Sequence, residues 1–161
     1  MAKRLRTNEA FRDKRANQKQ IEKFPGDTKC PECGLVFMGG VWRKTTTAAV
    51  RDSPPKLCPA CLQIRDGRAG GMVEIMGSFT SGHREELLNR IRNVEKQTAE
   101  DRPMERIISI KETKDRIVVS VTTEHLVARI GKAVKRDFGG NLQLKYAPEE
   151  KFAMAHWRRD I

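Results

Sequence analysis

Hydrophobic positions recur with two different periods in residues 72–161. A period of two is typical of strands that bury one face, and Ile117, Val119 and Val121 follow it between polar neighbours. This pattern, with the turn residues that bound it, predicts strands over 72–76, 107–112, 116–122, 142–146 and 152–157. The second and third strands form a hairpin turning at 114–115, and the last two form another around 147–149.

A period of about 3.6 residues, which indicates a helix with one buried face, occurs twice in the same region. Ser81 is placed to cap the first helix and Thr123 the second, because hydroxyl oxygens accept hydrogen bonds from the free N–H groups of a first turn. Gly139 and Gly140 end the second helix. The buried stripes are Leu87, Leu88, Ile91 and Val94 on the first helix, and Leu126, Val127, Ile130, Ala133, Val134 and Phe138 on the second.

The predicted order is strand, helix, strand, strand, helix, strand, with one strand added at the end. This order predicts an α+β domain of the split βαβ, or ferredoxin-like, arrangement. Two helices would cover one face of an antiparallel sheet and bury their stripes against it.

The four cysteines form two pairs, Cys30 with Cys33 and Cys58 with Cys61, each with a proline after its first cysteine. Two Cys-x-x-Cys turns that meet place four thiolates in a tetrahedron, the preferred geometry of one structural Zn²⁺ ion. Gly34 suits a turn whose amides point at sulfur. Three other chemistries compete: two disulfides, for which no secretory signal precedes the pairs, a thioredoxin-like redox motif, and an iron centre.

These patterns divide the chain into four parts. Residues 1–28 are polar and basic and are expected to form a flexible arm. Residues 29–66 are expected to form a Cys₄ zinc ribbon, whose short strands are limited by Gly39-Gly40 and Pro54-Pro55. A glycine-rich linker at 67–71 then leads to the α+β domain at 72–161.

The formal net charge is +11, from 32 basic and 21 acidic residues. The first 70 residues carry +8 of it (15 basic against 7 acidic), which favours a polyanionic partner, nucleic acid before membrane. A solvated arm, and aromatic residues that only cover a small core, are the competing interpretations. The candidate nucleic-acid contacts are Lys3, Arg4, Arg6, Arg12, Lys14, Arg15, Trp42, Arg43, Lys44, Arg51 and Lys56.

The Cys-Pro-x-Cys-Gly turn at 30–34, the Cys-Pro-x-Cys turn at 58–61 and the Phe-Gly-Gly passage within 136–144 resemble the zinc-binding family named for nonsense-mediated decay. Eukaryotic members of that family are export adaptors of the large ribosomal subunit. The resemblance covers about residues 29–146 and implies contact with ribosomal RNA or a ribosomal subunit. Family members carry more Cys-x-x-Cys pairs, and longer ones continue further. The chain therefore resembles a short, minimal relative, to which the export role does not carry over.

Catalysis is not expected, because His83, His125 and His156 fall on separate predicted elements and no paired carboxylates stand out. The sequence favours a non-enzymatic, cytoplasmic zinc-ribbon protein that binds ribosomal RNA or a ribosomal subunit, with other ribosomal factors as further partners. It would have no small-molecule substrate and no membrane contact, since no apolar run approaches about 18 residues. Two alternatives remain open, a protein–protein adaptor and a DNA-binding zinc-ribbon regulator.

Overall fold

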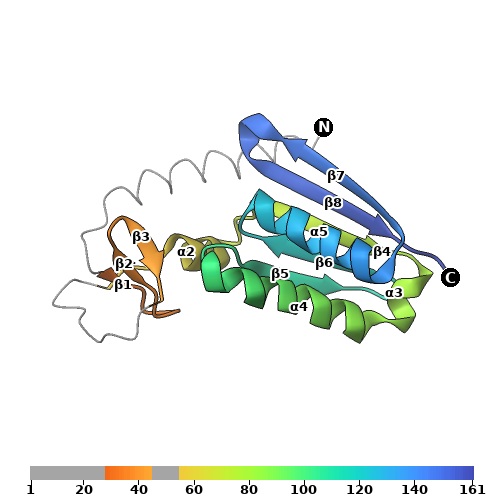
Figure 1. Ribbon diagram of the computed structural model, residues 1–161, viewed down its shortest axis with the longest axis horizontal. Helices are drawn as coiled ribbons and strands as arrows, with labels where there is room; N and C mark the ends of the chain where they lie inside the picture. The colour runs from red at the N-terminus through yellow and green to blue at the C-terminus, as the bar shows by residue number, and fades with distance from the viewer. Residues whose placement is uncertain (1–27, 45–54) are drawn as a thin grey trace. The chain divides into compact units, whose positions relative to one another are not determined.

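The computed structural model describes residues 28–44 and 55–161 (Figure 1). The chain divides into two compact units, one ending at Arg68 and the other spanning Ala69–Ile161. We call residues 28–44 and 55–68 the cysteine unit, and Ala69–Ile161 the sheet unit. Residues 1–27 of the predicted arm lie outside the described residues, whereas its last residue, Thr28, is buried in the first strand.

The cysteine unit contains a small antiparallel sheet and one helix. Strands β1 (Thr28–Lys29), β2 (Val36–Met38) and β3 (Val41–Arg43) pair in that order. The turn between β2 and β3 falls at Gly39 and Gly40, where the sequence predicted an interruption. The core of the sheet includes the buried Leu35, Val36 and Trp42.

Helix α2 (Pro59–Asp66) was not predicted, although both of its ends carry recognisable signals. Pro59 occupies the first turn, where its missing N–H costs nothing. Gly67 ends the helix with φ of 65° and donates its N–H to the end of α2, a conformation that glycine adopts without strain. The boundary between the two units falls inside the predicted linker at 67–71, whose first residue, Gly67, caps α2 and whose last, Gly71, already lies in a strand.

The sheet unit consists of a five-stranded sheet and helices that pack on it (Figure 1). All five strands predicted in residues 72–161 are present, with ends shifted by no more than one residue. Its elements are β4 (Gly71–Met76), α3 (Ser78–Gly82), α4 (Arg84–Asp101), β5 (Ile107–Glu112), β6 (Arg116–Val121), α5 (Glu124–Phe138), β7 (Asn141–Ala147), the 3₁₀ turn η1 (Pro148–Glu150) and β8 (Phe152–Arg158).

The spatial order of the strands is β5-β6-β4-β8-β7, which corrects two expectations. The sheet is mixed rather than antiparallel, because β8 pairs in parallel with β4. The strand after the second helix, β7, lies at the edge, whereas the ferredoxin-like arrangement would place it beside β4. Helix α5 is a crossover from β6 to β7, so β8, which returns from β7 in a hairpin, runs in the direction of β4 and pairs with it.

Helices α4 and α5 lie over the same face of the sheet (Figure 1). Their predicted stripes are buried in one core with the inward side chains of β4, β6 and β8, except that Phe138 is only partly buried. Trp157 of β8 is the largest fully buried side chain. Tyr146, which alternates with the partly buried Leu142 and Leu144, is 54% exposed near the end of β7.

One of the two predicted helix caps is confirmed. The Thr123 hydroxyl accepts a hydrogen bond from the Leu126 N–H at 3.2 Å, as a cap of α5 should. The prediction for Ser81 is wrong, because Ser81 lies inside the short helix α3 and its hydroxyl donates to the Ser78 carbonyl. Helix α4 begins only after His83, whose side chain makes no cap and instead stacks on Phe79.

The C-terminal segment is fixed to the start of α3 by Asp160. Its carboxylate accepts a hydrogen bond from the Ser78 backbone N–H at 2.9 Å and another from the Arg158 guanidinium at 2.9 Å. These donors, the Ser78 N–H first, lower the pKa of Asp160 below its ordinary value of 3.8.

A folded-state pKa below the unfolded value means that Asp160 stabilises the fold above pH 3.8, and that this contribution is lost as pH falls through the folded pKa. We expect Asp160→Asn to lower the thermal midpoint slightly at pH 7 and by less at pH 2. Thermal melts at both values check this. An equal loss at both values would contradict the role of the ionised carboxylate.

Among the described residues, no helix has both the length and the apolar content that a membrane span requires.

Candidate metal centre

The four cysteines of the cysteine unit come together as the sequence predicted. Their four sulfur atoms all lie within 4.8 Å of one another. Cys30 and Cys58 are buried, Cys61 is half-buried, and Cys33 is exposed. No disulfide joins any two of these four cysteines, and the Cys33 and Cys58 sulfurs are 3.7 Å apart. A tetrahedron with metal–sulfur bonds of about 2.3 Å has sulfurs about 3.8 Å apart, so the cluster has the size of a four-thiolate metal site.

The first pair lies in a closed turn between β1 and β2. The Cys30 N–H donates to the Leu35 carbonyl at 2.8 Å, and the Gly34 N–H donates to the Cys30 carbonyl at 3.0 Å. Gly34 has φ of 77°, a left-handed conformation that side chains other than glycine rarely adopt. The predicted turn at Gly34 is confirmed, and its hydrogen bonds close the segment that carries Cys30 and Cys33.

The second pair is built differently, at the N-terminus of α2. Cys58 is the N-cap residue, and its sulfur accepts a hydrogen bond from the Cys61 N–H at 3.4 Å. The positive end of a helix favours a thiolate over a thiol. A Cys-x-x-Cys pair at a helix start is the arrangement that the redox interpretation required. Here, however, the other pair completes a set of four sulfurs.

The environment of Cys30 favours its thiolate form. Burial by itself raises the pKa of this thiol, but backbone N–H groups of Cys58, Cys33 and Glu32 point at its sulfur. Their combined effect lowers the pKa of Cys30 from 9.0 to about 7. Because metal ions bind thiolates, the lowered pKa of Cys30 favours metal binding at this site.

The basic residues predicted to contact nucleic acid are only partly described. Arg43, Lys44 and Lys56 are all exposed. Trp42 is 4% exposed, and its ring centroid lies 5.4 Å from that of Phe37, as the core-packing alternative requires. The other predicted contacts lie outside the described residues: Lys3, Arg4, Arg6, Arg12, Lys14, Arg15 and Arg51.

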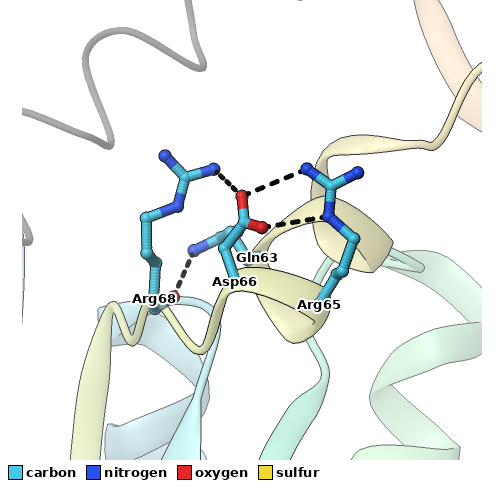
Figure 2. A network of polar contacts seen from close by, with 4 residues as sticks. All are labelled: Gln63, Arg65, Asp66 and Arg68. Atoms are coloured by element: carbon cyan, nitrogen blue, oxygen red, sulfur yellow. Dashed lines mark hydrogen bonds and ion pairs between the residues drawn. The ribbon is translucent and has the colours of Figure 1, made fainter.

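Sequence reasoning missed a polar network at the end of α2 (Figure 2). The Asp66 carboxylate lies between two guanidinium groups, 3.0 Å from Arg65 and 2.9 Å from Arg68, which lower its pKa, Arg65 most strongly. The Gln63 amide donates to the Arg68 carbonyl at 3.2 Å and closes the turn. The predicted ribbon ended at residue 66 and the predicted linker began at residue 67, so the sequence did not predict this Arg-Asp-x-Arg arrangement, which adds two cations to the cysteine unit.

The three histidines occupy separate places in the sheet unit. His83 stacks on Phe79, His125 lies beside Glu124, and the His156 ring nitrogen is 2.9 Å from a Glu74 oxygen. Glu74 also forms an ion pair with Arg116. These pairs are contacts between neighbouring side chains on the sheet or on one helix turn. Among the described residues they do not assemble a nucleophile with its base.

Comparison of the chain with protein-family models, with curated proteins and with solved structures found no match.

Proposed function

We propose that this chain is a non-enzymatic RNA-binding protein of the ribosome or of a ribosomal subunit, ordered locally by one structural Zn²⁺ ion. The observation that carries the proposal is the four-cysteine cluster in a unit with exposed cationic side chains at Arg43, Lys44 and Lys56. A cytoplasmic location belongs to the same proposal.

Zinc is the proposed ion because four cysteine sulfurs form a closed donor set with no position left for a reacting water. Two of the four are buried, which suits an ion that holds structure rather than one that meets substrate. A single iron would accept the same donors. Metal analysis of protein purified without added metal separates the two, since a ferric thiolate centre is coloured and a zinc centre is not.

RNA is the proposed partner because the net charge of +11 is concentrated in the part of the chain that includes the cysteine unit. The resemblance to ribosome-associated zinc proteins supports ribosomal RNA within that class. Binding would rest on cations of the cysteine unit that neutralise phosphates. The small module can hold them in fixed positions only when its metal is bound.

Replacing Arg43, Lys44 and Lys56 together by alanine is expected to weaken binding to a ribosomal RNA fragment by about tenfold or more, and to flatten its salt dependence. Fluorescence anisotropy at several salt concentrations measures both quantities. The matched control replaces Lys111, Lys114 and Lys145, all exposed in the sheet unit, and removes the same charge.

Zinc content should be unchanged in both variants. Equal affinities for the two would show that net charge, rather than the surface of the cysteine unit, determines binding. Competition by DNA as strong as that by RNA would favour a DNA-binding regulator instead.

One observation favours the adaptor as a second candidate. The tip of the β2–β3 hairpin exposes two apolar side chains, Met38 at 39% and Val41 at 54%. A protein partner that covers them would bind with little salt dependence, whereas RNA binding weakens steeply as salt rises. If the wild-type chain still binds ribosomal material at high salt, and Met38→Ser/Val41→Ser does not, the adaptor function would be favoured.

A further inference from the structure

A groove of about 330 Å³ runs between α4 and α5 on the outer side of the helical layer. Its floor includes Val94 and Ala133, which are 6% exposed and belong to the core. Its polar walls are predominantly cationic. The charged residues that line it are Arg90, Asp101, Arg102, Arg129, Lys132 and Arg136.

Helical periodicity explains why these cations face one groove. Arg129, Lys132 and Arg136 are three and four residues apart, so they follow one side of α5. The buried stripe of α5 includes Ile130 and Val134, on a different side. On α4, Arg90 lies four residues before Val94 and faces the same groove.

Carboxylates hold part of this charge but do not cancel it. Arg90 and Arg136 both pair with Asp137, and Arg129 lies 3.7 Å from the buried Glu105. With Asp101, Asp137 and Glu105 all counted, the groove still keeps a positive formal charge.

Several cations of the groove are exposed, and two of these, Arg102 and Lys132, are not held by the carboxylates named above. No ion pair joins either of them to a carboxylate within residues 28–44 and 55–161.

We propose that this groove binds the phosphodiester backbone of RNA, as a contact separate from the cysteine unit. The inference deepens the proposed function and rests on it. At 1.5 Å of rise per residue, Arg129, Lys132 and Arg136 span about 10 Å along the helix axis. A strand within a double helix advances about 3.4 Å of axis per phosphate, so this span is long enough for two or more phosphates.

The walls suit phosphate better than another anion or an apolar group. Arginine guanidiniums form paired hydrogen bonds with phosphate oxygens, and four of the five cations are arginine. The groove lies open along the helices, and no aromatic ring among the described residues lines it, so bases would not be read. The contact would therefore be independent of sequence and sensitive to salt.

The test is the double charge reversal Arg102→Glu/Lys132→Glu in the full, zinc-loaded chain. Binding of a fluorescein-labelled single-stranded RNA should weaken by about tenfold, and the slope of log K against log salt should shrink by about 1.4, since each lost phosphate contact removes about 0.7. The matched control, Lys96→Glu/Lys135→Glu, makes the same charge change on exposed residues of the same helices outside the groove. It should weaken binding by less than about threefold, because only the long-range field changes.

The outcomes separate the two proposals. If the wild-type chain binds RNA and the Arg43, Lys44 and Lys56 variant weakens that binding, but the groove variant behaves like its control, only the groove proposal is overturned. If the wild-type chain binds no RNA, both proposals are overturned. If polyglutamate displaces RNA from the wild-type chain as well as RNA does, the groove is a site for acidic peptide and the RNA assignment is overturned.

Discussion

Replacing Cys58 by serine is expected to unfold the cysteine unit and to release its metal, while the sheet unit stays folded. Cys58 is fully buried and has its sulfur 3.7 Å from that of Cys33, so serine, which can still cap α2, removes a metal ligand from the cluster. Metal binding contributes on the order of 10–16 kcal/mol to the folding of small zinc modules, far more than their cores supply. Metal analysis and an amide NMR spectrum measure the two effects.

Chelation gives the matched control for this variant. A strong chelator should collapse the amide signals of the cysteine unit in the wild-type chain, and added Zn²⁺ should restore them. The Cys58→Ser spectrum should not respond to zinc in this way. If the Cys58→Ser protein retained one metal per chain and its amide signals were as well dispersed as those of the wild-type chain, the four-thiolate assignment would be contradicted.

Replacing Trp157 by alanine is expected to cost the sheet unit about 3–5 kcal/mol of unfolding free energy, the usual range for a large aromatic residue removed from a core. Trp157 is fully buried in β8, beside the parallel strand β4. Its ring lies edge-on to Phe79 at 6.1 Å, and its indole N–H donates to the Gly139 carbonyl at 2.6 Å. The substitution therefore leaves both a cavity and an unpaired carbonyl at the end of α5.

Urea unfolding followed by circular dichroism measures this loss. Trp157→Phe keeps most of the volume and should cost clearly less. Tyr146→Ala, at a 54% exposed position, should change stability by about 0.5 kcal/mol or less. If the Trp157→Ala unfolding curve overlaid the wild-type curve, the packing of Trp157 in β8 would not contribute to the stability of this unit.

The elements that the sequence predicted well are those whose signals are local. Helix α5 has a capping Thr123, an unbroken apolar stripe and Gly139 at its end, and its observed bounds agree with these signals. The hairpin of β5 and β6 is equally local, since Ile117, Val119 and Val121 alternate and all three are fully buried. The metal cluster was predictable because Cys-x-x-Cys spacing fixes the ligand geometry within each pair.

What the sequence did not predict depends on contacts between distant residues. Alternation identifies β7 and β8 as strands but does not show that β8 pairs with β4. That pairing depends on where helix α5 places the last two strands in the sheet. Ser81 has the residue type of a cap, but the chain first forms the short helix α3, and α4 begins after His83. Trp42 among basic neighbours was a candidate nucleic-acid contact, yet a small module with few apolar residues buries it.

Gradient sedimentation of the tagged chain from native lysate, at low and then at high salt, tests the central claim most directly when zinc is measured on the same purified protein. The account predicts one zinc per chain and co-migration with a ribosomal subunit at low salt, lost at high salt because phosphate contacts weaken as salt rises. The Arg43, Lys44 and Lys56 variant should keep its zinc and migrate near the top of the gradient even at low salt. A wild-type chain that stays at the top in both conditions with its zinc bound would contradict the assignment to the ribosome.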